Sequence, residues 1–239
     1  MFYYYGFDWT YLILVLPCII LSLIASASVN STFKKYSSQV SARGITGAQA
    51  AQRVLSSNGV AGVRIERVSG NLTDHFDPKT NVIRLSDSVY DNTSTAAIGV
   101  ACHEAGHAVQ YAQNYFPIQI RAAIIPLTNF GSKLAMPLIL IGILFSTLGA
   151  FSTTLVQLGI ACFGLSFVFQ LITLPVEFNA SRRAMRAIKD TNLLTHDEQE
   201  GAKKTLTAAA MTYVAAAAVA LAQLLRLILL FGNRGRRRD

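Results

Sequence analysis

Residues 95–114 read TAAIGVACHEAGHAVQYAQN, a run of small and apolar residues that contains the pattern His-Glu-x-x-His. Asn92 or Thr93 can cap a helix that begins at this run and continues through it. Residues four positions apart lie on one face of a helix, so His103 and His107 can direct ring nitrogens at a single point. Two of the protein's four histidines fall within these five residues. The run therefore predicts a metal site on a helix, with zinc as the expected ion.

Glu104 follows the first histidine and lies one step round the same helix. Its carboxylate can take a proton from a water that zinc has made acidic, and can pass that proton to a leaving amine. A catalytic zinc needs three protein ligands and one open position for water, so a further ligand must come from elsewhere in the chain. The pattern predicts a hydrolytic site in which Glu104 is the general base.

The composition is that of a membrane protein. Hydrophobic residues make up 52% of the 239 residues and charged residues only 14%, against about 25% charged in an ordinary soluble domain; the mean hydropathy is +0.39. The net charge of +8 comes from basic residues beside apolar runs, which favours contact with anionic lipid over nucleic acid. The three cysteines lie far apart in the sequence, which excludes a disulfide framework and an all-cysteine zinc site.

Four apolar runs are long enough to cross a bilayer, which needs about 20 residues of helix. They lie at 9–29, 133–150, 155–176 and 207–231. A short uncharged turn at 151–154 joins the second and third runs, so we expect a helical hairpin. No positive charge precedes the first run, which favours a retained anchor over a signal peptide. The fourth run contains Arg226, and a charge at that depth is costly unless it snorkels or faces a protein cavity.

The runs predict an alternation of membrane and aqueous segments. The expected parts are an anchor at 1–29, a metallopeptidase segment at 30–132, a transmembrane hairpin at 133–176, a segment with the third zinc ligand at 177–206, a membrane helix at 207–231 and a basic tail at 232–239. Lysine and arginine beside a span tend to stay in the cytoplasm, and Lys34 and Lys35 follow the first run. We therefore expect a multi-pass plasma-membrane protein with its N-terminus outside and its site on the cytoplasmic side. The arginine tail agrees with this rule only if the last helix does not cross.

The segment 30–132 has the composition of one small soluble domain. Thr46 is expected to cap a helix that ends before Asn58 and Gly59. Residues 60–68 and 81–85 alternate in polarity as strands do, which predicts a two-strand ribbon. The strand at 81–85 precedes the histidine helix and offers an edge with which an extended peptide could pair.

The third ligand must come from the acidic and histidine side chains on the cytoplasmic side. The candidates are Glu177, Asp190, His196, Asp197, Glu198, Glu200, His75, Asp74 and Asp77. Glu177 stands out because it is an acidic group at the end of the third apolar run, before a basic segment. The alternative is that its carboxylate stabilises the start of a helix through the macrodipole.

Four segments resemble a known family, the YugP-like neutral zinc metallopeptidases, which are bacterial membrane proteins. The segments are HEAGHAVQ at 103–110, LPVEFNASRRA at 174–184, GNLTDHFDP at 70–78 and AAMTYVAAA at 209–217. The resemblance extends over about residues 46–229. It implies an α-helical membrane protein with about four membrane helices and a small α+β, zincin-like metallopeptidase domain of the gluzincin type. It also implies that His103, His107 and Glu177 are the zinc ligands and that Glu104 is the general base.

One position departs from the family pattern, in which the segment after the glutamate ligand usually reads EFDAS. Asn179 replaces the aspartate, so a carboxylate that could orient a zinc-bound histidine is missing, although the amide oxygen can still accept a hydrogen bond from an imidazole. The segment DHFDP resembles the family's DHYDP, and its Asp74 and His75 could line the cleft. The oxyanion could be held by His196, Tyr213, Arg182 or Arg183, with His196 the first candidate.

The leading hypothesis is a membrane-bound zinc endopeptidase that acts on unfolded or membrane-associated chains. Its expected partners are the lipid bilayer, a peptide substrate and other membrane proteins, and no nucleic acid. The sequence does not predict an oligomeric state. The alternative is a non-catalytic zinc-binding membrane scaffold or adaptor, to which Asn179 gives some weight. A zinc transporter is disfavoured because the spans lack paired carboxylates or histidines.

Overall fold

The structure is a computed structural model that describes residues 3–4 and 7–232, and the chain divides into two units. The described parts of unit 1 come from residues 3–4, 7–24, 120–174 and 212–232, and unit 2 comprises residues 25–119 and 175–211. The expected basic tail lies, apart from Gly232, outside the described residues. Each unit combines segments that are far apart in the sequence, so each is held together by tertiary packing.

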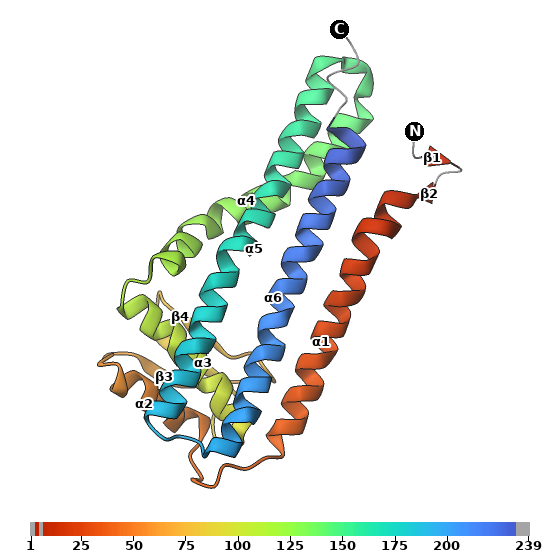
Figure 1. Cartoon of the computed structure of the whole chain (residues 1–239). Coiled ribbons are helices and arrows are strands. Elements are labelled where there is room, and N and C mark those ends of the chain that lie inside the picture. The colour runs from red at the N-terminus through yellow and green to blue at the C-terminus, as the bar shows by residue number, and fades with distance from the viewer. Residues whose placement is uncertain (1–2, 5–6, 233–239) are drawn as a thin grey trace. The chain divides into compact units, whose positions relative to one another are not determined.

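Most of the chain is helical (Figure 1). Four helices among the described residues are long and apolar enough to cross a membrane: Tyr11–Ser37, Phe116–Leu144, Ala150–Asp190 and His196–Phe231. The first combines a π-helical start, η1 (Tyr11–Val15), with α1 (Leu16–Ser37); the others are α4, α5 and α6. A short strand pair, β1 (Tyr3–Tyr4) and β2 (Phe7–Asp8), precedes them. The expected number of membrane-length helices is confirmed.

The hairpin of α4 and α5 lies mainly in unit 1, and its turn is earlier than the sequence predicts. A 3-10 turn, η2 (Ser146–Leu148), and Gly149 with φ of 61° connect the helices, so the turn expected at 151–154 is wrong. Residues 151–154 are already helical because the chain reverses where glycine permits a left-handed conformation. The hydroxyl of Ser152 donates to the carbonyl of Gly142 at 2.6 Å and ties the two helix ends together.

The charged residue in the fourth apolar run has a partner in unit 1. The Nε of Arg226 donates to Oδ2 of Asp8 at 2.9 Å, and the side chains of both residues are about one-fifth exposed. Asp8 immediately precedes the first long helix, and Arg226 lies near the end of α6. The pair therefore places the start of the first long helix beside the end of α6.

Unit 2 contains a three-strand sheet in place of the predicted two-strand ribbon. Its strands are β3 (Arg64–Val68), β4 (His75–Asp77) and β5 (Val82–Ser86), in the order β3-β5-β4. Strand β5 pairs in parallel with β3 and antiparallel with β4. The prediction that 81–85 offers a free edge is wrong, because β5 is the central strand and both of its sides are paired. The free edges belong to β3 and β4.

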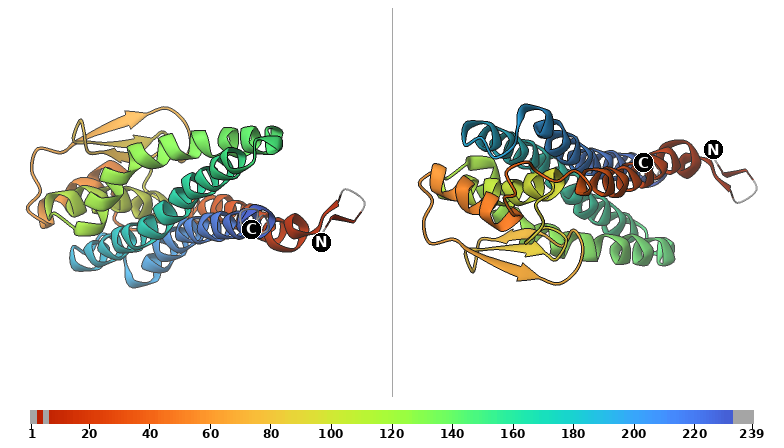
Figure 2. Two further views of the ribbon diagram at one scale, coloured as in Figure 1. Left: turned by 90° about the horizontal axis from the view of Figure 1, so that it is seen from above. Right: turned by 90° about the horizontal axis from the view of Figure 1, so that it is seen from below.

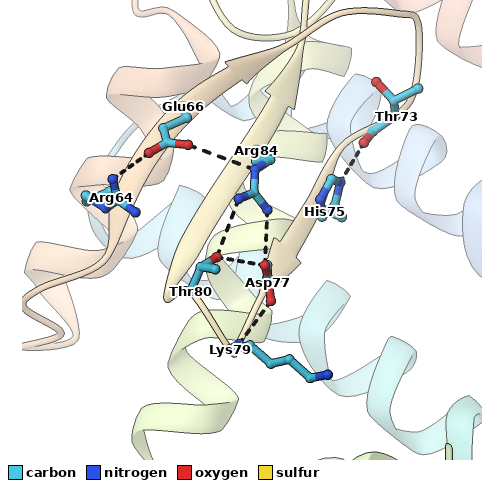
Figure 3. A network of polar contacts seen from close by, with 8 residues as sticks. All are labelled: Arg64, Glu66, Thr73, His75, Asp77, Lys79, Thr80 and Arg84. Carbon is cyan, nitrogen blue, oxygen red and sulfur yellow. Dashed lines mark hydrogen bonds and ion pairs between the residues drawn. The ribbon is translucent and has the colours of Figure 1, made fainter.

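The reversal between β4 and β5 is held by a polar network (Figure 3). Asp77 accepts hydrogen bonds from the hydroxyl of Thr80 at 2.7 Å, from the backbone N–H of Lys79 at 3.0 Å and from Arg84 at 3.2 Å. The hydrogen bond from Thr80, followed by those from Lys79 and Arg84, lowers the pKa of Asp77 to about 2. The Asp-Pro sequence, expected as a turn, therefore ends a strand and starts the turn that returns the chain to β5.

Two helices, α2 (Gly47–Ser57) and α3 (Thr95–Ala112), pack together and contact the sheet (Figure 2). The capping box expected at Thr46 is present, since its hydroxyl accepts from Gln49 N–H and the Gln49 side chain accepts in return. The cap of α3 is Ser94, whose hydroxyl accepts from Ala97 N–H, while Asn92 accepts from Ser94 N–H at 2.8 Å. The expectation that Asn92 or Thr93 caps α3 is therefore wrong by one or two residues.

Candidate metal centre

Small residues bring α3 and the last part of α5 into close contact within unit 2. Gly106 lies in the middle of the His-Glu-x-x-His pattern, and a Cβ added there would come within 2.8 Å of the Ala180 carbonyl oxygen. Ala105 and Ala180 are fully buried. Because no larger side chain separates the two helices here, a carboxylate on α5 can reach the histidines of α3.

Helix α5 is continuous from Ala150 to Asp190, with Pro175 inside it. Glu177 therefore lies within the helix, and the alternative that its carboxylate stabilises a helix start is wrong. Its side chain is only 3% exposed. A carboxylate buried so deeply needs partners of opposite charge or a metal ion.

Three side chains converge at this contact: His103, His107 and Glu177. Their possible ligand atoms all lie within 4.8 Å of one another. Oε2 of Glu177 is 3.2 Å from Nε2 of His103 and 3.5 Å from Nε2 of His107. The two imidazole rings meet edge to face, with centroids 4.7 Å apart. Both Nε2 atoms therefore address the same carboxylate oxygen.

The other ring nitrogen of each histidine has its own partner. Nδ1 of His103 lies 3.1 Å from the hydroxyl of Ser181 on α5, and Nδ1 of His107 lies 3.0 Å from Oε1 of Gln110 on α3. When Nδ1 carries the proton and donates, Nε2 keeps a free lone pair. The two contacts hold both rings with Nε2 toward Glu177.

The amide of Gln110 is fixed in turn by neighbours on α5. Its Nε2 donates to the Val176 carbonyl at 2.8 Å and to Oδ1 of Asn179 at 3.0 Å. Oδ1 of Asn179 also accepts from Nε of Arg183 at 2.7 Å. Because the Gln110 nitrogen is engaged by two acceptors, its oxygen faces His107. Asn179 thus acts on the histidine through Gln110, and not through the direct imidazole contact that the sequence suggested.

A second carboxylate, Glu104, lies on α3 beside the histidines and is 9% exposed. Burial, together with the nearby charge of Glu104, raises the pKa of Asp74, although hydrogen bonds from Ser86 oppose this effect. Oδ1 of Asp74 accepts from Ser86 N–H at 2.7 Å, and Oδ2 accepts from its hydroxyl at 3.0 Å. Of the two DHFDP residues predicted to line the cleft, Asp74 is therefore the one that lies near Glu104.

The centre carries a negative field. Burial disfavours the charged form of His107, but the hydrogen bond to Glu177 and the charge of Glu104 outweigh burial and raise the pKa of His107. An environment that favours an imidazolium also favours a divalent cation at the same place. The side chains of His103 and His107 are 13% and 11% exposed, so the centre retains limited contact with solvent.

The other predicted site residues lie elsewhere in the structure. His75 is exposed on β4, where its Nδ1 contacts the Thr73 carbonyl oxygen (Figure 3). His196 is fully exposed at the start of α6, with Nδ1 3.7 Å from Asp197. Among the oxyanion candidates, Arg183 is bonded to Asn179, Arg182 donates to the Phe178 carbonyl at 3.4 Å, and Tyr213 belongs to unit 1.

The reasoning from sequence missed Gln110 and Ser181. Each has a weak signal in hindsight: Gln110 follows the second histidine by three residues, and Ser181 follows Glu177 by four. Both spacings place the two residues of a pair on one helix face. Gln110 is also fully buried, which is uncommon for a polar side chain without a specific partner.

The donor set fits zinc. Two imidazole nitrogens and one carboxylate oxygen are usual ligands of a catalytic zinc, which leaves a fourth position open. Ligands about 2.1 Å from a tetrahedral ion stand roughly 3.4 Å apart, and Oε2 of Glu177 lies 3.2 and 3.5 Å from the two histidine Nε2 atoms. Calcium and magnesium prefer oxygen ligands in larger number, so they fit this site less well.

Comparisons with known proteins agree with this chemistry. Residues 11–232 match the model of a family described as "Putative neutral zinc metallopeptidase". A relative from Bacillus subtilis (strain 168), named "Putative membrane protease YugP", is 45% identical over 223 residues, which cover 93% of this chain and 97% of the relative. No solved structure gives a significant match. The family match and the relative cover nearly the whole chain, so the protein belongs to this family of membrane-associated neutral zinc metallopeptidases.

Proposed function

We propose that the protein is a membrane-bound zinc endopeptidase with a zincin-like domain of the gluzincin type. The observation that carries the proposal is the meeting of two histidine nitrogens and a Glu177 oxygen beside a second carboxylate, Glu104. His103, His107 and Glu177 would hold the ion, and the separation of their ligand atoms, all within 4.8 Å of one another, supports this assignment. Bound zinc supplies a Lewis acid that acidifies a water and polarises the peptide carbonyl.

The chain's own residues supply the remaining steps. Glu104 takes a proton from the attacking water as the new C–O bond forms. It then returns that proton to the nitrogen of the leaving amine as the C–N bond breaks. Ser181 and Gln110 accept the Nδ1 protons of His103 and His107, which keeps both Nε2 lone pairs directed at the centre.

The proposed substrates are unfolded or membrane-associated polypeptide segments. Strand β4 is a free edge of the sheet, and its Phe76 ring contacts the Tyr111 ring of α3 at a centroid distance of 5.6 Å. An extended chain can add to such an edge through backbone hydrogen bonds. Folded proteins do not offer free backbone of this kind, so extended segments are the favoured substrates.

The proposed location of the site is the cytoplasmic face of the plasma membrane. Lys34 and Lys35 end the first long helix on the side of unit 2, and positive charge beside a span favours the cytoplasm. The pairing of Asp8 with Arg226 supports a start of the first long helix and an end of α6 on the same side of the membrane. A cysteine introduced at Ser56, which is exposed on α2, tests this location: labelling of intact cells by a membrane-impermeant maleimide would contradict it.

The test of the activity compares zinc content and casein cleavage in detergent-purified protein. Wild type is expected to hold about one zinc per chain. His103→Ala and Glu177→Ala are expected to lose zinc and cleavage together. Glu104→Gln is expected to keep zinc and to lose cleavage by at least about 100-fold.

The matched control is Glu66→Gln, which removes a partly exposed carboxylate from β3 and should change neither quantity. Zinc in Glu177→Ala at the wild-type level would contradict the assignment of the third ligand. Zinc without any cleavage in wild type would favour the alternative function, a non-catalytic zinc-binding scaffold.

A further inference from the structure

A cavity lies in unit 2 between the last part of α5 and the first part of α6. Its volume is about 860 Å³, which is within the usual range for small-molecule sites. Helix α5 contributes the wall from Phe178 to Asp190, and α6 contributes the wall from Gln199 to Met211. We call it the α5–α6 cleft. It borders the zinc centre at Ser181, whose hydroxyl contacts His103, but it contains none of the three metal-ligating residues and not Glu104.

Basic side chains dominate the polar lining of the α5–α6 cleft. Arg182, Arg186 and Lys189 lie at intervals of four and three residues on α5, so they form one stripe along the helix. Lys203 on α6 adds a fourth positive charge. Among the described lining residues the single carboxylate is that of Asp190. The charge of the cleft therefore favours an anion.

A neighbouring cavity shows that basic residues alone do not make such a site. It has about the same volume, 880 Å³, and is lined by Lys35, Lys203 and Lys204. Its lining also includes Asp197 and Glu200, and Glu200 is 2.7 Å from the Lys204 ammonium group. Positive and negative charges nearly balance there, so the excess of positive charge is larger in the α5–α6 cleft.

The α5–α6 cleft also has an apolar part. Phe178 and Met211, which are 40% and 47% exposed, lie at the end of the cleft from which each helix continues into its apolar membrane-length run. Leu206 and Ala210 add apolar wall on α6. The cleft thus combines an apolar end, adjacent to the apolar runs, with a cationic end further from them.

We propose that the α5–α6 cleft binds an anionic phospholipid, with its phosphate against the basic stripe and the start of its acyl chains against Phe178 and Met211. This polarity matches that of a lipid, whose charged and apolar parts are joined in the same order. Basic pockets between membrane helices are known to take anionic head groups. The proposal does not depend on peptidase activity, because it rests on the basic stripe, Phe178 and Met211, and not on a metal-ligating residue or Glu104.

The first test is native mass spectrometry of the full-length protein in detergent, titrated with phosphatidylglycerol or phosphatidylcholine. Wild type is expected to bind phosphatidylglycerol more tightly. The double variant Arg182→Gln with Arg186→Gln is expected to bind it at least about tenfold more weakly, since each basic residue near a lipid surface contributes roughly a fivefold effect. The matched control, Arg53→Gln with Lys79→Gln, removes two exposed charges outside the cleft and should bind as wild type does.

Equal affinity of the double variant and the control for phosphatidylglycerol would overturn the proposal. Binding of an acidic peptide, with no preference for phosphatidylglycerol over phosphatidylcholine, would also overturn it and would identify the cleft as a peptide site. A second measurement is independent of variants: a photoreactive phosphatidylglycerol in nanodiscs should cross-link to residues 178–190 and 199–211. Cross-links confined to other segments would contradict the assignment.

Discussion

Replacement of Gln110 by leucine tests the hydrogen-bonded chain that orients His107. Gln110 is fully buried and makes three contacts: with Nδ1 of His107, with the Val176 carbonyl and with Asn179. Leucine has a similar volume but offers no acceptor to Nδ1, so the ring is no longer held with Nε2 toward Glu177. Loss of a partner that orients a metal-bound histidine typically weakens metal binding 10- to 100-fold, or by about 1.4–2.7 kcal/mol.

The assay is zinc affinity, measured by competition with a fluorescent chelator on purified protein. The matched control is Gln113→Leu, at the C-cap of the same helix, which removes an exposed amide whose oxygen accepts from Arg183 at 2.5 Å and which touches no ligand. We expect Gln110→Leu to bind zinc at least about tenfold more weakly than wild type and Gln113→Leu to bind it equally well. Zinc affinity of Gln110→Leu within twofold of wild type would refute the argument.

Three further changes test other parts of the structure. Asn179→Asp should alter zinc affinity by less than about threefold, because both donors to residue 179 address the one oxygen that the two side chains share. Gly106→Ala should lower the free energy of unfolding by about 1–3 kcal/mol, because its Cβ would meet the Ala180 carbonyl at 2.8 Å; the melting temperature measures this. Folding lowers the pKa of Asp77, so in wild type the ionised Asp77 contributes stability that is fully present above pH 3.8 and is lost as the pH falls toward 2. Asp77→Asn should lack this contribution and its pH dependence, which unfolding midpoints across that range measure.

Each of these three expectations has an outcome that would contradict it. A loss of zinc from Asn179→Asp comparable to that of a ligand variant would show that the amide nitrogen matters. An unchanged melting temperature of Gly106→Ala, equal to that of Gly164→Ala, would contradict the close approach, since a Cβ at Gly164 meets only one side-chain atom, 3.9 Å away. Equal loss of stability of wild type and Asp77→Asn between pH 4 and 2 would remove Asp77 as the cause.

The parts of the fold that sequence reasoning predicted are those with strong local signals. Apolar runs near 20 residues predict membrane-length helices whatever their packing, and the Thr46 capping box fixes the start of α2. The histidine pair is readable because its spacing of four residues matches the helix period. Glu177 was the leading candidate because an acidic residue at the end of an apolar run needs a specific reason to be there, and the structure brings it to the histidines.

The parts that were missed depend on contacts between distant segments. Strand β4 has only three residues, too few to show a polarity pattern, so the central position of β5 could not be read from the sequence. Helix α4 begins at Phe116, well before the apolar run at 133–150. This start was missed because Arg121 and Lys133 lower the local hydropathy without breaking the helix. Gln110 has no motif of its own, and its role follows only from the approach of α5.

Both the third member of the metal group and the hydroxyl that steadies His103 come from one turn of α5, at Glu177 and Ser181. In the order of synthesis, α3 is complete long before that turn, and the whole of α4 and the first part of α5 are translated in between. A chain that is still being made therefore has two histidines and no third partner for an ion. The group closes only after the hairpin has been translated and the end of α5 has packed against α3, so assembly of the centre marks completion of the fold.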